Sequence, residues 1–155
     1  MKLHQLLILP LVLITVLSCT TTLADGYVLV SQEDVSRSLA AEGAEELVER
    51  AADPLGPDIE ILRPGEGDEF EAPVDIYITF VPTPGAEIDL DTLEIKYGAL
   101  GINVTDRVTE NAEVTPGGIR SEGAMLPAGK HKLTVYIGDN QGRMGKRRFA
   151  FRISK

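Results

Sequence analysis

The feature that most constrains the fold is a strict alternation of apolar and polar residues, clearest in "VDIYITF" at residues 74–80. A repeat of two residues matches a β-strand, in which successive side chains point to opposite faces of a sheet. One face would carry the apolar set and the other the polar set, which are Val74, Ile76, Ile78 and Phe80 against Asp75, Tyr77 and Thr79. The segment therefore predicts a strand with one buried face.

Similar short apolar or alternating runs recur through the last hundred or so residues, separated by segments rich in Gly, Pro and Asp. We expect about seven strands, near residues 59–62, 74–80, 93–97, 102–108, 117–126, 132–139 and 144–153. Residues 66–73 and 81–92 are expected to form a turn and a loop. No segment here has the length of a crossover helix, which disfavours a parallel sheet. The prediction is a mainly β fold, an antiparallel β-sandwich over residues 57–155.

The segment "KLTVYIGD" at 132–139 alternates as well. It predicts that Leu133, Val135 and Ile137 face the core, while Thr134 and Tyr136 face solvent.

The N-terminal segment has the pattern of an export signal. Lys2 precedes an apolar run from Leu6 to Leu17 that is too short to span a bilayer comfortably. Two cleavage sites are compatible with it. Cleavage after Ala24 would make residues 1–24 an ordinary signal peptide, whereas "VLSC" resembles a lipoprotein signal, with residues 1–18 removed and a lipid on Cys19. Either way we expect an exported protein that is periplasmic, anchored to the outer membrane or secreted, and not cytoplasmic.

Residues 25–56 predict one amphipathic helix and a linker. Ser31 is a good N-cap, Asp34 lies where a capping box requires it, and Asp53–Pro54 would end the helix. The expected helix runs from about Ser31 to Ala52. Its apolar stripe would consist of Val35, Leu39, Ala44, Leu47, Val48 and Ala51. The sequence leaves open whether this helix packs on the sandwich, binds another protein or acts as a spacer.

The net charge argues against nucleic acid as a ligand. The chain carries 24 acidic and 15 basic residues, a formal charge of −9. Phosphate backbones bind to basic surfaces, so we expect no nucleic-acid partner. Contact with a membrane is expected only through a lipid on Cys19.

Several segments together resemble the immunoglobulin-like (Ig-like) modules of bacterial surface and secreted proteins. They are "PDIEILRPGEGDEF", "APVDIYITF", "IDLDTLEIKYG", "LPAGKHKLTVYIGDNQGR" and "FAFRI". The resemblance spans residues 57–153 and implies an Ig-like sandwich without implying any catalytic residue. The chain differs from antibody domains because Cys19 is its only cysteine and it has no tryptophan.

His131 is the residue that would most naturally serve in catalysis, because His4 lies in the signal segment. Catalysis would need a nucleophile or a second ligand nearby, and no such motif is present. In the modules that this chain resembles, the position of His131 holds a Tyr that ties a turn to its strand. We therefore predict a structural role in the turns for His131, Gly129 and Gly142, and no enzymatic activity.

Acidic residues in the loops suggest a calcium site, since calcium binds six or more oxygen atoms. The candidates are Asp68, Glu69, Asp89, Asp91 and Asp139. Their spacing matches no EF-hand loop, and Asp is also a common turn residue. No other cofactor is expected.

The sequence favours a non-enzymatic Ig-like module with a binding or structural role in the bacterial cell envelope, whose partner is a protein or an envelope polymer. One alternative is an accessory or inhibitor subunit that docks on an envelope enzyme through the N-terminal helix. Another is a calcium-binding surface module.

Overall fold

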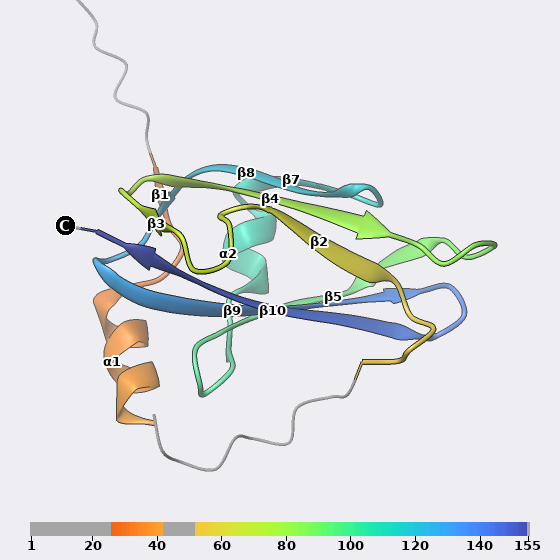
Figure 1. Ribbon diagram of the computed structural model, residues 1–155, viewed down its shortest axis with the longest axis horizontal. Helices are drawn as coiled ribbons and strands as arrows, with labels where there is room; N and C mark the ends of the chain where they lie inside the picture. The colour runs from red at the N-terminus through yellow and green to blue at the C-terminus, as the bar shows by residue number, and fades with distance from the viewer. Residues whose placement is uncertain (1–25, 42–51, 155) are drawn as a thin grey trace, which may run out of the picture.

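The structure is a computed structural model that describes residues 26–41 and 52–154. These residues contain ten strands and two short helices (Figure 1). The strands are β1 Tyr27–Val28, β2 Asp58–Arg63, β3 Glu69–Phe70, β4 Val74–Val81, β5 Ile88–Tyr97, β6 Ile102–Asn103, β7 Ala112–Thr115, β8 Gly118–Met125, β9 Gly129–Asp139 and β10 Met144–Ile153. The helices are α1 Gln32–Ala40 and α2 Thr105–Thr109. The prediction of a mainly β chain is confirmed.

The strands form two sheets, which Figure 1 shows as two layers. The first sheet has the order β1-β8-β4-β2, with β7 also paired to β8, and the second has the order β3-β10-β9-β5-β6. All pairs of long strands are antiparallel, as predicted, but β1 pairs with β8 and β3 with β10 in parallel. Both sheets are therefore mixed.

The expected number of about seven strands is wrong for the described residues, which contain ten. The three unexpected strands are β1, β3 and β7, and they have two, two and four residues. β1 and β3 are too short to show an alternation, and the four residues of β7 alternate over only two periods, which is too few to predict a strand. The strand β5 also begins at Ile88, within the expected loop 81–92.

The two sheets share one apolar core. Alternation in β4 buries Val74, Ile76, Ile78 and Phe80, each at most 5% exposed, as predicted. The second sheet contributes mainly Leu133, Val135 and Ile137 of β9 and Phe149, Phe151 and Ile153 of β10. Removal of these apolar side chains from water is the main stabilisation of the two-layer arrangement.

The outward face of β9 departs from the prediction, because Thr134 and Tyr136 are buried. Tyr136 lies opposite Lys146 of β10 and Glu94 of β5 in the sheet register. The ammonium groups of Lys96 and Lys146 lie 5.3 Å and 5.7 Å from the centre of its ring. Long side chains on the flanking strands cover the ring, which strand alternation alone does not reveal.

The segment before β2 is part of the layered structure. Leu29 and Val30 are fully buried in the core, and β1 pairs with β8. Ser31 caps α1 and forms the predicted capping box with Asp34. Residues 27–30 thus pack directly against the sheets.

Within the described residues, the helix α1 buries a different face from the predicted one. It ends at Ala40, with Ala41 as its C-cap, and the predicted continuation through residues 42–51 lies outside the described residues. Its buried residues are Asp34 and Ser38, while Leu39 of the predicted apolar stripe is 58% exposed. Polar contacts explain the difference, because the hydroxyl of Ser38 accepts a hydrogen bond from the backbone N–H of Ala99.

Residues 102–108, expected as a strand, form the two-residue β6 and then the helix α2. Val104 and Val108 lie one helical turn apart and are both buried. The side chain of Asn103 accepts a hydrogen bond from the backbone of Thr105, which begins the helix. Two buried valines are too few to distinguish a helix from a strand by their period.

Within the two described ranges, no helix is long and apolar enough to cross a membrane. The predicted signal segment, both predicted cleavage sites and Cys19 lie outside the described residues.

Candidate functional site

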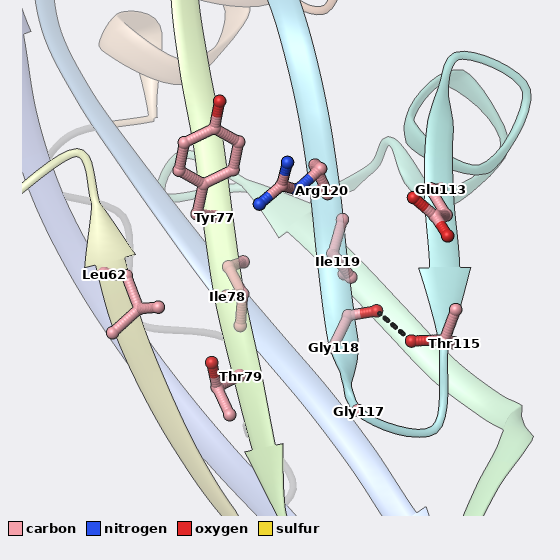
Figure 2. A pocket seen from close by; sticks show the side chains of 10 residues that line it. All are labelled: Leu62, Tyr77, Ile78, Thr79, Glu113, Thr115, Gly117, Gly118, Ile119 and Arg120. Carbon is pink, nitrogen blue, oxygen red and sulfur yellow. Dashed lines mark hydrogen bonds between the residues drawn. The ribbon is translucent and has the colours of Figure 1, made fainter.

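The candidate site is an open hollow of about 330 Å³ on the outer face of the first sheet (Figure 2). It lies over β4 and β8 and is bordered by β2 and β7. Its lining residues are Leu62, Tyr77, Ile78, Thr79, Glu113, Thr115, Gly117, Gly118, Ile119 and Arg120. We call it the outer hollow.

Strand register determines which side chains meet in the outer hollow. Tyr77 of β4 lies opposite Arg120 of β8, which lies opposite Glu113 of β7. These three residues form one row across the sheet. In Figure 2 the Tyr77 ring and the Arg120 guanidinium lie next to each other at one end of the hollow.

A second row explains why the surface is hollowed. Thr79 of β4 lies opposite Gly118 of β8, which lies opposite Thr115 of β7. Gly118 has φ +144°, and a Cβ atom at this position would lie 2.0 Å from the carbonyl oxygen of Ile78. Only glycine fits so close to β4, so the middle of this row carries no side chain.

Charged groups in the outer hollow are available to a ligand. The guanidinium carbon of Arg120 lies 5.0 Å from the centre of the Tyr77 ring, a cation–π contact. Among the described residues, neither Arg120 nor Glu113 forms an ion pair, although they are directly opposite each other. Both side chains are exposed. The hollow therefore offers a hydrogen-bond donor and an acceptor side by side.

His131 lies away from the outer hollow, in the core near the start of β9. Its Nε2 lies 2.8 Å from the carbonyl oxygen of Pro127, so Nε2 carries the proton and donates. Its Nδ1 then accepts a hydrogen bond from the hydroxyl of Tyr97 at 3.1 Å. Burial lowers the pKa of His131, while the bond to Pro127 acts in the opposite direction. Both ring nitrogens are used in holding the turn before β9.

A smaller cavity of about 190 Å³ lies between α1 and the start of β9. His131, Tyr97, Ser38 and Leu39 are among its lining residues. The polar atoms of His131 and Ser38 already have hydrogen-bond partners within the protein. A ligand here would have to break contacts that hold α1 to the sheets.

The turn between β9 and β10 is held by Asp139. Its carboxylate accepts hydrogen bonds from the backbone of Gln141 and Arg143, each at 3.0 Å, and from Nε of Arg143 at 2.7 Å. The side-chain bond from Arg143 is the main reason why the pKa of Asp139 is lowered. Gly142 has φ +77° and closes the turn, while Gly129 begins β9.

The five calcium candidates do not converge. Glu69 pairs with Arg152 near the end of β10, and Asp68 precedes it. Asp139 ends β9 at the other end of the same sheet, roughly 30 Å away at about 3.3 Å per residue. Asp89 lies near Asp139, but its carboxylate accepts a bond from the backbone of Asp91, and that of Asp139 is bonded as above. In the described part of the chain, no three His, Cys, Asp or Glu side chains form a metal-binding group.

The sequence correctly placed two residues of the outer hollow, Tyr77 and Thr79, on the outward face of their strand. It did not identify these residues, or Arg120 and Glu113, as parts of a site. Arg120 lies in a weakly predicted strand, and Glu113 lies in the unexpected strand β7. The signal that could have found them is "EVTPGGIR", where extended segments flank a Pro-Gly-Gly turn in the manner of a hairpin.

Comparison with known proteins identifies no family. No family model matches the chain, and no curated protein does. An endo-β-1,4-mannanase from Thermotoga petrophila is 13% identical over 79% of this chain, with a TM-score of 0.47. CopC from Methylosinus trichosporium is 16% identical over 62% of this chain and 93% of its own length, with a TM-score of 0.43.

An engineered protein is 13% identical over 68% of this chain, with a TM-score of 0.44. The chain spans 24% of the mannanase and 21% of the engineered protein. All three TM-scores lie below the level at which a shared fold would support an argument.

Proposed function

We propose that the chain is an exported, Ig-like β-sandwich module that binds a protein or polymer of the bacterial cell envelope and has no catalytic activity. The proposal rests on the outer hollow, where the exposed Arg120 and Glu113 form no ion pair with any described residue and Arg120 lies beside Tyr77. Exposed complementary groups gathered on one sheet face favour recognition of another molecule.

The features of the sequence that favour an Ig-like module agree with this role. The apolar run before Cys19 favours export, and two layers whose long strands pair antiparallel are compatible with an Ig-like arrangement. Modules of this kind present loops and sheet faces to their ligands while the core stays closed.

The state of His131 supports a non-catalytic role. A general base needs a free nitrogen within reach of a substrate, and both nitrogens of His131 are engaged in the core. The outer hollow contains no histidine, cysteine or serine that could act as a nucleophile with a base.

Docking through the N-terminal helix remains a second proposal, in which the chain is an accessory or inhibitor subunit of an envelope enzyme. Leu39, 58% exposed on α1, would contact the enzyme. The half-buried Val35 already packs against the core, which leaves α1 a narrow apolar face.

Sedimentation with envelope fragments tests the main proposal. The processed chain, as an expression host exports it, is mixed with envelope fragments of the organism that encodes it. We expect saturable co-sedimentation, weakened about tenfold or more when Tyr77→Ala and Arg120→Ala are combined. Arg152→Ala, which changes an exposed arginine of the second sheet, is the matched control and is expected to bind normally.

Two outcomes would contradict the proposal. One is the absence of saturable binding by the unaltered chain. The other is equal binding by the double variant, once its thermal unfolding midpoint shows that it is folded.

A further inference from the structure

The outer hollow also indicates the chemistry of its ligand, an inference that rests on the function proposed above. Arg120 and Glu113 are direct cross-strand neighbours, which places their Cβ atoms about 5 Å apart. A guanidinium only donates hydrogen bonds, and a carboxylate only accepts them. A ligand that satisfies both needs adjacent groups that accept and donate, and a hydroxyl group does both.

The charges at the site favour an uncharged ligand. Arg120 and Glu113 carry opposite formal charges, so a charged ligand would be attracted by one and repelled by the other. The net charge of −9 on the chain additionally disfavours an anionic polymer. A cationic ligand would have to approach the guanidinium of Arg120, which already lies beside the Tyr77 ring.

The position of the hollow on a sheet face disfavours an extended peptide. β4 is paired on one side with β2 and on the other with β8, so its backbone groups already belong to the sheet. A peptide that adds itself as a strand would have to pair with an edge strand, β2 or β7, and would then lie beside the hollow and not over it. Side chains are therefore the groups that remain for recognition over β4 and β8.

The remaining lining residues suit a chain of sugar rings. Thr79 and Thr115 flank Gly118 with further hydroxyl groups, in a row about 7 Å from the row of Tyr77. Leu62, 64% exposed, and the Tyr77 ring supply apolar surface for the C–H faces of a sugar. An open hollow lets a polymer continue beyond the contact on both sides.

We propose that the outer hollow binds an uncharged saccharide chain. Neighbouring hydroxyl groups of one sugar bridge Arg120 and Glu113, and a ring lies against Tyr77 and Leu62. No bond is formed or broken, so the site acts by recognition alone.

Binding to a panel of defined hexasaccharides tests this inference. The uncharged probes are cellohexaose, mannohexaose, xylohexaose, maltohexaose and N-acetylchitohexaose. The charged probes are hexagalacturonic acid and the chitosan hexamer, and tryptic peptides of casein represent peptides. Affinity is measured by calorimetry on the processed chain, and the contact surface is mapped by amide NMR shifts. We expect at least one uncharged probe to bind and to shift amides of β4, β7 and β8.

The sharpest test is the direction in which two variants, each lacking one charged side chain, change the affinity for the ligand. With an uncharged saccharide, Arg120→Ala and Glu113→Ala should each weaken binding about tenfold, because each removes one side of the bridge. An anionic ligand would instead bind more tightly to Glu113→Ala, and a cationic ligand to Arg120→Ala. Arg152→Ala and Glu71→Ala are the controls, since both change exposed residues outside the outer hollow.

The inference is overturned if no uncharged probe binds at about 10 mM. It is also overturned if only charged probes or peptides bind, or if the two variants change affinity in opposite directions. Its failure is separable from failure of the proposed function. If envelope fragments still retain the chain through Tyr77 and Arg120 while the uncharged saccharides do not bind, the binding module stands and only its ligand class is wrong.

Discussion

At the scale of single residues, Asp34 links α1 to Arg107 of α2. Its carboxylate accepts hydrogen bonds from the backbone and hydroxyl of Ser31, at 3.0 Å and 2.8 Å, and from Arg107 at 2.7 Å. Burial by itself would raise the pKa of Asp34, but the bonds from Arg107 and Ser31 outweigh burial and lower the pKa from 3.8 to about 2. Asp34 thus belongs to the capping box of α1 and also anchors this helix to Arg107.

Asp34→Asn should lower the free energy of unfolding by about 2 kcal/mol at neutral pH. The folded-state pKa lies below the unfolded one, so this stabilisation is complete above about pH 3.8 and is lost as the pH falls to about 2. Urea unfolding of the unaltered chain and of Asp34→Asn at several pH values measures this stabilisation.

The difference in free energy of unfolding between the two proteins should shrink as the pH falls from about 3.8 to about 2. A difference that persisted at about pH 2 would contradict the assignment of this stabilisation to the ionised Asp34. Glu33→Gln, which removes an exposed pair with Arg37, should have little effect.

His131 should make stability sensitive to mild acid. Its folded-state pKa is lowered by burial, so the unfolded chain takes up a proton near pH 6.5 while the folded chain does not. Stability should therefore decline as the pH falls below 6.5, by at most about 1.4 kcal/mol per pH unit from this residue. Thermal unfolding between about pH 7.5 and about pH 5.5 should show this decline, and His131→Gln should flatten it. Equal slopes for both proteins would count against the assignment.

At the scale of elements, the close approach of β8 to β4 shapes the outer hollow. Gly118→Ala would place a Cβ atom 2.0 Å from the carbonyl oxygen of Ile78, at a φ of +144° that alanine rarely adopts. We expect it to lower the free energy of unfolding by about 2 kcal/mol or more. Gly117→Ala is the matched control, because its nearest contact would be Thr115 Oγ1 at 3.6 Å.

Differential scanning calorimetry compares the two glycine variants. The control should unfold within a few degrees of the unaltered chain, and Gly118→Ala well below it. Similar midpoints would mean that β8 can move away from β4, and the outer hollow would then not depend on Gly118.

The elements also show how far sequence patterns predict this fold. The long strands β4, β9 and β10 lie where alternation places them, because each has enough residues to display a period of two. The short elements β1, β7 and α2 were missed or misassigned, since fewer than six residues do not establish a period. In the candidate site, the outward face of β4 was predictable, whereas the row that joins Tyr77, Arg120 and Glu113 was not.

At the scale of the whole molecule, residues 27–30 complete a core that is formed mainly by the two sheets of residues after 57. Leu29 is 0% exposed, and its backbone N–H donates to the carbonyl oxygen of Met125 at 3.1 Å. The hydroxyl groups of Tyr27 and Ser121 are also bonded, at 2.5 Å. Removing this segment would expose the apolar surface that it covers.

Leu29→Ala should lower the free energy of unfolding by about 3 kcal/mol, because it leaves a cavity in a closed core. Leu39→Ala, in which the same change is made at a side chain that is 58% exposed, should cost less than about 0.5 kcal/mol. Urea unfolding of the two variants measures both values. If both cost little, the N-terminal segment would be only loosely attached to the sandwich.

Local sequence patterns were enough to predict the mainly β class, the positions of β4, β9 and β10, the inward set of β4 and the cap of α1. These features depend on residues that are neighbours along the chain, so their spacing is written in the sequence. The tertiary structure decided which strands pair, that Tyr136 is covered by Lys96 and Lys146, and that the outer hollow exists. The physical reason is that these features arise from register between strands distant in the sequence, and no local period records that register.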